Sequence, residues 1–285
     1  MTLPLPLPLA RSAVDRAAER RGDGAWLAEA WRGGQVLVVD PRGNATGTAD
    51  GLELLPADRA PAGERYFLGV DDGGLAYWAV PVAEPLEGPQ VGLWEAGASL
   101  GARDAGLFTT ARALANWHQT HRHCPRCGAA TEVAQAGWVR RCPADGSEHY
   151  PRVDPAVIML VHDGADGVLL GRKAEWPEGR YSILAGFVEP GESLEQAVAR
   201  EVAEETGVAV RDVKYLGSQP WPFPSSLMLG FMAVADAGAT VVPDLAELED
   251  ARWFSRAELL SERDAPRLPP PVSIAYRLLR TWLER

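Results

Sequence analysis

The first hundred residues alternate hydrophobic and polar positions in a pattern that predicts short strands. The stretches "AWRGGQVLVVD" and "RYFLGVDDGGLAYWAVPV" are rich in β-branched and aromatic residues, and turns containing Gly, Pro and Asp punctuate them. Residues 106–121, "GLFTTARALANWHQTH", then show helical spacing, with Leu107, Ala111, Leu114 and Trp117 on one side. We predict an N-terminal mixed α+β domain over residues 1–106. Its tryptophans are expected to be core residues: Trp26, Trp31, Trp78 and Trp94.

From residue 151 onward, longer apolar runs surround a single amphipathic helix. The runs "AVIMLVHD" and "GVLLGRK" are strand-like, and "GADG" between them predicts a hairpin. "YSILAGFV" precedes the helix, while "VKYLGSQPWPFP", "LMLGFMAVA" and "ARWFS" follow it before a closing helix, "SIAYRLLRTWLER". Strands on both sides of one helix, without a regular βαβ repeat, indicate a mixed α/β fold. No internal repeat is visible in the sequence.

The helix that begins near Leu194 carries glutamates in an unusual place. An advance of about 100° per residue puts Leu194, Ala197, Val198 and Val202 on one apolar stripe. The same geometry puts Glu201 and Glu205 inside that stripe and Glu204 at its edge. Solvated charges belong on the opposite side, and like charges four residues apart repel each other. The three carboxylates therefore predict a cation site, and their hard oxygens suit Mg²⁺ or Mn²⁺.

The segment "GFVEPGESLEQAVAREVAEETGV" resembles the Nudix box, G-x5-E-x7-R-E-U-x-E-E-x-G-U with U aliphatic, at every fixed position. The matching residues are Gly186, Glu192, Arg200, Glu201, Val202, Glu204, Glu205, Gly207 and Val208. The resemblance implies a Nudix α/β/α sandwich over residues 153–285 and hydrolysis of a nucleoside diphosphate linked to another group. It also implies that Glu201, Glu204 and Glu205 hold divalent ions. Arg200 is expected to orient a glutamate rather than to bind substrate.

A proline-rich stretch, "SQPWPFPSS", follows ten residues beyond the box. Its prolines exclude a central strand, and by composition alone it could be an edge segment or a polyproline ligand. The stretch is also similar to the SQPWPFPxS signature of the NADH pyrophosphatase subfamily, and this likeness covers residues 107–285. It implies cleavage of NADH and NAD⁺ to nicotinamide mononucleotide plus AMP, removal of NAD caps from RNA 5′ ends, and a homodimer.

The same resemblance assigns roles to further residues. Trp221 and Phe187 are expected to stack on the nicotinamide, which aromatic rings are suited to do. Glu247 matches a loop glutamate that also binds the catalytic metal, although on its own it would be an ordinary surface acid. Other positions match the subfamily's substrate pocket: Tyr150, Ser226, Met228 and Ala275.

The cysteines lie within nineteen residues of one another and suggest a metal rather than disulfides. "CPRCG" has zinc-knuckle spacing at Cys124 and Cys127, and Cys142 follows. The subfamily has a fourth cysteine where this chain has Asp145, so the fourth ligand is open between Asp145 and His149. We predict a structural zinc ribbon that, with its linking helix, spans residues 107–152.

Composition and charge limit the alternatives. A formal net charge of −11 makes sequence-independent binding to nucleic acid a poor expectation. The sequence contains neither a membrane-spanning run nor a secretory signal pattern, so we expect a cytoplasmic protein. Two alternatives stay open: a Nudix hydrolase of ADP-ribose or another dinucleotide, and a catalytically dead ribbon-bearing protein that binds nucleic acid.

Overall fold

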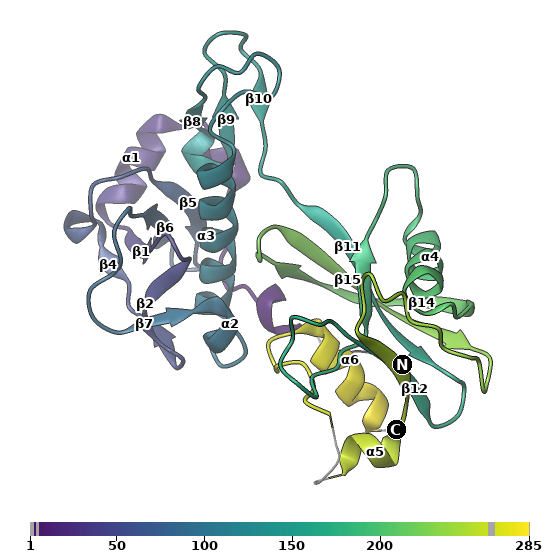
Figure 1. Ribbon diagram of the computed structural model, residues 1–285. Coiled ribbons are helices and arrows are strands. Elements are labelled where there is room, and N and C mark those ends of the chain that lie inside the picture. The colour runs from purple at the N-terminus through teal and green to yellow at the C-terminus, as the bar shows by residue number, and fades with distance from the viewer. Residues whose placement is uncertain (1–2, 4–5, 262–265, 285) are drawn as a thin grey trace. The chain divides into compact units, whose positions relative to one another are not determined.

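The computed structural model describes residues 3, 6–261 and 266–284, which form two compact units. The N-terminal unit contains Pro8–Val153 together with Pro220–Ser225. The C-terminal unit contains Asp154–Gln219, the described residues from Ser226 onward and those before Pro8. In Figure 1 the chain colours run from purple to teal in the N-terminal unit and from teal to yellow in the C-terminal unit.

A 7-stranded sheet forms the centre of the N-terminal unit, in the order β3-β2-β1-β6-β5, with β4 added to β1 and β7 to β2. Its β1 and β6 are parallel neighbours, and the other pairs are antiparallel. The strands are β1 (Gln35–Val39), β2 (Asn44–Thr48), β3 (Gly51–Leu52), β4 (Leu55–Pro56), β5 (Tyr66–Val70), β6 (Ala76–Pro81) and β7 (Gln90–Gly92).

Three α-helices accompany this sheet: α1 (Gly24–Arg32), α2 (Leu93–Ala96) and α3 (Ala102–Thr120). Helix α3 packs along β1, β5 and β6, and its Leu107, Ala111, Leu114 and Trp117 are buried. The predicted helix is therefore confirmed. Short 3-10 turns complete the unit: η1 (Pro8–Ala10), η2 (Ala18–Arg20), η3 (Ala57–Arg59) and η4 (Gln135–Gly137).

Three short strands form the ribbon: β8 (Glu132–Ala134), β9 (Val139–Arg141) and β10 (Glu148–His149). Buried polar groups tie the ribbon to α3. His118 Nε2 donates to Gly137 O over 2.7 Å, and Arg140 Nη1 donates to His118 Nδ1 over 2.9 Å. The His118 ring also stacks on Tyr66, with centroids 4.3 Å apart. These bonds require a neutral imidazole, and burial lowers the pKa of His118 to about 4.

Acidification from pH 7 to pH 5 is expected to destabilise the protein through His118. The pKa of His118 in the folded chain lies below its value of about 6.5 in the unfolded chain. The free energy of unfolding is therefore fully retained above about pH 6.5 and decreases as the pH falls towards 4. At pH 5 the free energy of unfolding is expected to be lower by on the order of 2 kcal/mol. Thermal unfolding across this range should show a shallower pH dependence for His118→Gln than for the unchanged chain. Identical slopes would contradict the prediction.

The C-terminal unit is built on a second sheet, in the order β14-β15-β11-β12-β16, with β13 added to β11. Its strands are β11 (Asp154–His162), β12 (Gly167–Arg172), β13 (Leu184–Phe187), β14 (Val210–Trp221), β15 (Ser226–Ala235) and β16 (Asp250–Ser255). β11 pairs in parallel with β15 and forms the predicted hairpin with β12. The helices are α4 (Leu194–Thr206), α5 (Arg256–Leu260) and α6 (Ile274–Leu283).

Strand β11 shows why helices cover both faces of this sheet. Ile158 and Leu160 face a core that contains residues of α6, whereas Val157, Met159 and Val161 face a core that contains residues of α4. Alternate side chains of a strand point to opposite faces, so a strand that is apolar throughout needs cover on both. The α4 and α6 ribbons lie on opposite sides of the sheet (Figure 1). The predicted α/β/α sandwich is confirmed, as is the mixed domain before it.

Within the described residues, no helix combines the length and hydrophobicity that crossing a membrane requires.

Candidate active site and zinc ribbon

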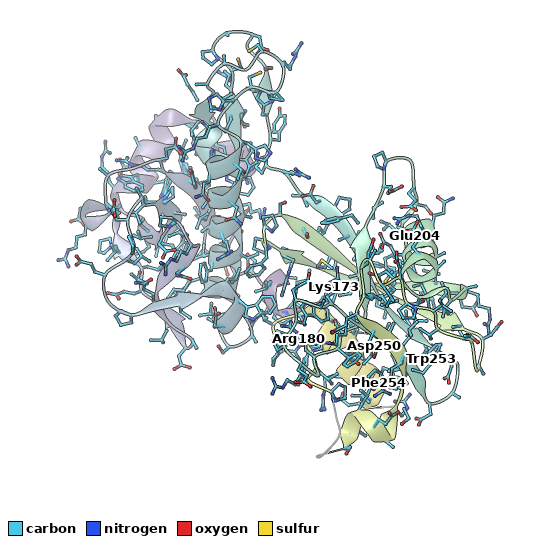
Figure 2. All side chains as sticks on the ribbon, viewed as in Figure 1. Lys173, Arg180, Glu204, Asp250, Trp253 and Phe254 are labelled. Atoms are coloured by element: carbon cyan, nitrogen blue, oxygen red, sulfur yellow. The ribbon has the colours of Figure 1, made fainter. Side chains whose placement is uncertain are left out.

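Helix α4 presents its glutamates because its two ends are well defined. Ser193 caps the first turn in a reciprocal pair of hydrogen bonds with Gln196, and Gly207 ends the helix with a φ of 69°. The apolar positions between them bury that face against β11 and β13. Glu201 and Glu205 are consequently buried, at 9% and 3% exposure, and Glu204 is exposed (Figure 2). This is the distribution that the helical spacing predicts.

Arg200 forms hydrogen bonds with three glutamate side chains of the segment 186–208. Its Nε and Nη2 donate to the two oxygens of Glu192 over 2.7 and 2.9 Å. Its Nη1 donates to Glu201 Oε1 and to Glu204 Oε2, each over 2.9 Å. The forked pairing lowers the pKa of Glu192 to about 2. Because Nη2 also donates to Phe187 O over 2.9 Å, Arg200 joins α4 to the end of β13.

Glu205 has no such compensation. Its Oε2 is buried and has no hydrogen-bond partner within the described part of the chain. Burial, and next the charge of Glu201, raises the pKa of Glu205 to about 8, while Lys173 after β12 opposes the rise. Burial also raises the pKa of Glu201. A buried carboxylate without a partner is costly unless a cation neutralises it.

The surroundings of Glu201 and Glu205 fit a divalent ion. A Cβ on Gly186 would lie 1.8 Å from the Glu201 carboxyl carbon, so only glycine leaves room for this side chain. The loop with Glu247 is fixed to the end of α4, because Asp244 N donates to Glu205 O over 3.0 Å and Val242 N donates to Thr206 O over 2.9 Å. The charge of Glu247 acts on both buried glutamates. The resemblance groups these two residues with Glu204 and Glu247 as metal ligands, and we call the four residues the carboxylate cradle; hard oxygen donors of this kind suit Mg²⁺ or Mn²⁺.

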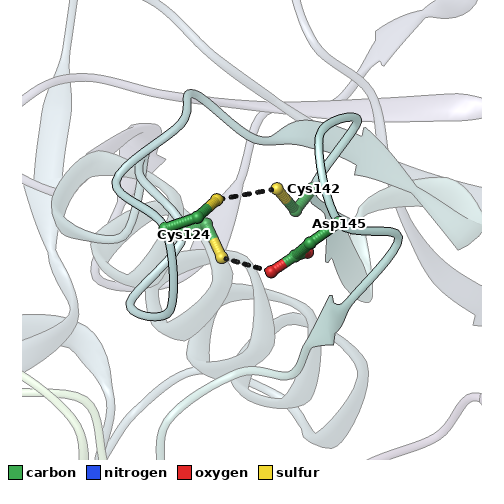
Figure 3. A group of neighbouring side chains, drawn as sticks. Cys124, Cys142 and Asp145 are labelled. Atoms are coloured by element: carbon green, nitrogen blue, oxygen red, sulfur yellow. Dashed lines mark hydrogen bonds between the residues drawn. The ribbon is translucent and has the colours of Figure 1, made fainter.

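The ribbon brings its cysteines together in two turns of the same form. Gly128 N donates to Cys124 O and Gly146 N donates to Cys142 O, each over 2.9 Å. Asp145 therefore takes the place in the second turn that Cys127 takes in the first. Ligand atoms from the three cysteines and Asp145 lie within 4.8 Å of one another (Figure 3). Cys127 Sγ is 3.5 Å from Cys142 Sγ, and Cys124 Sγ is 3.6 Å from Asp145 Oδ2. Tetrahedral zinc with Zn–S bonds of 2.3 Å needs S···S separations of about 3.8 Å, so these residues fit the ion.

Comparison with known proteins identifies the domains in which these two groups of residues lie. Family models match a NUDIX domain at residues 152–273, an NADH pyrophosphatase zinc ribbon domain at 119–150 and an NADH pyrophosphatase-like rudimentary NUDIX domain at 27–117. The NAD-capped RNA hydrolase NudC of Mycobacterium bovis and that of Mycobacterium tuberculosis are each 43% identical, over 96% of this chain and 94% of theirs. This chain belongs to the NudC family of Nudix hydrolases. The human NAD-capped RNA hydrolase NUDT12 is also 43% identical, over 64% of this chain and 42% of its own.

Membership in the NudC family shows that the chain is a hydrolase with a Nudix domain and a zinc ribbon domain. It argues against the alternative of a catalytically dead protein. The family match also shows that the N-terminal domain is Nudix-like, which the sequence pattern did not indicate because this domain has no box by which a repeat could be seen. The parallel pair β1 and β6 in its sheet has a counterpart in β11 and β15 of the C-terminal unit.

The residues that the NudC resemblance assigns to substrate lie in both units. In the C-terminal unit, Phe187 exposes 60% of its surface next to the cradle helix, while Ala275 is buried at 3% in the core to which Met228 is adjacent. Ser226 opens β15 opposite Asp154. Trp221 and Tyr150 belong to the N-terminal unit, where Tyr150 is 65% exposed and donates to Glu148 Oε2 over 3.1 Å.

Sequence reasoning missed several residues around these sites. Lys173 gave no signal beyond its position after a strand. Ser147 lies between Asp145 and His149, donating to Asp145 Oδ1 over 2.5 Å and lying 3.1 Å from His149 Nε2. The group of close ligand atoms contains Asp145 and not His149, although His149 also forms a hydrogen bond with Cys124. The pattern C-P-x-x-G occurs in both "CPRCG" and "CPADG". This repeat was the signal that could have favoured Asp145 over His149 as the fourth zinc ligand.

The purified protein is expected to hold about one zinc ion per chain, bound by Cys124, Cys127, Cys142 and Asp145. Cys142→Ala should remove the zinc, and Asp145→Ala should release it at a lower chelator concentration. His149→Ala should retain it like the unchanged chain. Elemental analysis after dialysis against a graded chelator series measures this. Loss of zinc from His149→Ala with retention by Asp145→Ala would reverse the assignment of the fourth ligand.

Proposed function

We propose that this chain is a metal-dependent pyrophosphohydrolase that cleaves NADH and NAD⁺ to nicotinamide mononucleotide plus AMP and removes NAD caps from RNA 5′ ends. The observation that carries the proposal is the carboxylate cradle, in which the buried Glu205 has an oxygen without a partner. The names of the NudC relatives and the two NADH pyrophosphatase family matches support the choice of substrate.

The reaction requires stabilisation of the negative charge on the diphosphate more than covalent catalysis by the protein. A water molecule attacks one phosphorus of the diphosphate, the bridging P–O bond breaks, and each product leaves with one phosphate. Divalent ions, when bound, supply neutralisation of the diphosphate charge and a more acidic water. Glu201, Glu204, Glu205 and Glu247 would hold them. One of these carboxylates takes the proton of the attacking water, and Arg200 keeps Glu192, Glu201 and Glu204 in place.

Substrate selection is proposed to rest on residues outside the cradle. Trp221 and Phe187 stack on the nicotinamide, since flat apolar rings bind a heteroaromatic ring well. Tyr150, Ser226, Met228 and Ala275 shape the remaining pocket.

We further propose that the catalytic ions are Mg²⁺ or Mn²⁺, that the ribbon zinc is structural, and that the chain is divided at residues 106/107 and 152/153. A homodimer and a cytoplasmic location are also proposed, on resemblance and sequence alone; light scattering tests the first and fractionation the second.

Product analysis tests the proposal directly. NADH, NAD⁺, ADP-ribose and NAD-capped RNA are offered separately, each with Mg²⁺, with Mn²⁺ and with a chelator, and the products are separated by chromatography. Metal-dependent formation of reduced nicotinamide mononucleotide and AMP from NADH is the expected result. Cleavage of ADP-ribose alone would keep the Nudix chemistry and overturn the assignment of NADH.

A further inference from the structure

The proline-rich segment Pro220–Ser225, which includes the last two residues of β14, belongs by its contacts to the N-terminal unit, whereas the rest of β14 and all of β15 belong to the C-terminal unit. Its aromatic side chains meet a tryptophan of α2. The ring of Trp94 lies edge-on to Trp221 at 5.2 Å and to Phe223 at 5.7 Å between centroids. Trp221 and Phe223 also contact each other at 4.8 Å. The orientation of Trp221 is therefore set by neighbouring rings and not by the segment alone.

The backbone of this segment depends on donors from α3. Prolines have no N–H, so Pro220, Pro222 and Pro224 donate no ladder hydrogen bond, and the carbonyls beyond the end of β14 need partners from elsewhere. Pro222 O accepts from Arg112 Nε over 3.1 Å and from Asn116 Nδ2 over 3.0 Å. Asn116 Nδ2 also lies 2.9 Å from Pro224 O. Arg112 and Asn116 are one helical turn apart, so a single face of α3 holds the segment at two carbonyls.

Arg112 is itself held by the turn between β1 and β2. Its Nη1 donates to Gly43 O over 2.7 Å and to Arg42 O over 3.2 Å. A Cβ on Gly43 would lie 2.3 Å from that nitrogen, and the φ of Gly43 is +79°, so this close approach requires glycine. The guanidinium carbon is also 4.7 Å from the centre of the Phe223 ring, a cation–π distance. Arg112 thus links the edge of the rudimentary NUDIX domain to the proline-rich segment.

We propose that Trp94, Arg112 and Asn116 are positioning residues through which the rudimentary NUDIX domain fixes Trp221 for recognition of the nicotinamide ring. This inference rests on the proposed role of Trp221. It gives the N-terminal domain a function in substrate selection. The three residues act through Trp221, so their effect should appear with substrates that carry nicotinamide and vanish when Trp221 is absent.

The test compares Asn116→Leu with Gln119→Leu, which also replaces a side-chain amide by leucine, at an exposed position of the same helix. Steady-state constants are measured for NADH and for ADP-ribose, which has no nicotinamide, in the unchanged chain and on a Trp221→Ala background. Asn116→Leu is expected to raise KM for NADH and to lower kcat/KM about tenfold, as the loss of two amide hydrogen bonds should. The ADP-ribose constants should stay within about twofold, and no further loss should follow on the Trp221→Ala background. Gln119→Leu should match the unchanged chain.

A second measurement separates this inference from the role of Trp221 itself. In protein labelled with 5-fluorotryptophan, the Trp221 resonance is identified by its absence in Trp221→Phe. Asn116→Leu and Arg112→Met should shift or broaden it, whether or not Trp221 contacts nicotinamide. An unchanged resonance together with unchanged NADH kinetics would overturn the inference, as would equal losses on both substrates that persist without Trp221. If Trp221→Ala alone leaves NADH turnover intact, the role of Trp221 fails, and the fluorine spectra decide whether the three residues hold it.

Discussion

Replacing Glu205 by glutamine is expected to lower kcat by about 10³-fold, within the range typical of losing a catalytic carboxylate, while leaving the fold intact. Glu205 is 3% exposed, and its Oε2 has no hydrogen-bond partner in the described part of the chain. Glutamine has nearly the same shape but cannot neutralise a divalent ion. The measurement is steady-state turnover of NADH at saturating Mn²⁺ or Mg²⁺, with circular dichroism as a check of the fold.

Thermal unfolding supplies a control that does not depend on activity. Burial raises the pKa of Glu205 to about 8, so folding disfavours its charged form, and this cost grows as the pH rises from about 4.5 to 8. With a chelator at pH 8, Glu205→Gln should therefore be at least as stable as the unchanged chain. Added Mn²⁺ should raise the unfolding temperature of the unchanged chain more than that of the variant. The exposed Glu195→Gln on the same helix should change neither property. Turnover of Glu205→Gln close to that of the unchanged chain would remove Glu205 from the cradle.

The burial of these glutamates could be predicted because it is a local property. Helical spacing relates Glu201 and Glu205 to Val198 and Val202 within a few turns, and no knowledge of the partner strand is needed. The two knuckle turns are equally local, since Gly128 and Gly146 follow the ligand positions directly and adopt positive φ values. For the same reason the carboxylate cradle and the ribbon follow from short stretches of sequence.

The environment of the proline-rich segment could not be predicted in this way. Arg112 and Pro222 are 110 residues apart, and nothing in the spacing of α3 indicates which backbone its donors reach. Trp94 illustrates the same limit: hydrophobicity favoured a core position, yet the ring is half-buried and packs on Trp221. Trp78, by contrast, is buried at 3% within the core as expected. Side-chain periodicity reports how much of a residue is buried but not what buries it.

Trp221→Ala is expected to lower kcat/KM for NADH about thirtyfold and to leave ADP-ribose within about threefold of the unchanged chain. Stacking of a nucleobase on an aromatic side chain is typically worth about 1–3 kcal/mol, and nicotinamide offers a comparable ring. ADP-ribose retains the diphosphate and the adenosine, so the cradle can act on it unaided by Trp221. Paired progress curves for the two substrates at equal metal concentration give the ratio directly.

The contacts of Trp221 determine which control is informative. Its ring touches both Trp94 and Phe223, so alanine also opens a small aromatic cluster, and a loss of activity could come from rearrangement of the segment. Trp221→Phe keeps an aromatic face and most of that packing, and it should retain at least a third of the NADH activity. A rearranged segment would affect NADH and ADP-ribose alike in both variants. Equal losses on the two substrates would therefore remove Trp221 from nicotinamide recognition, whereas a loss confined to NADH and restored by phenylalanine would assign it that role.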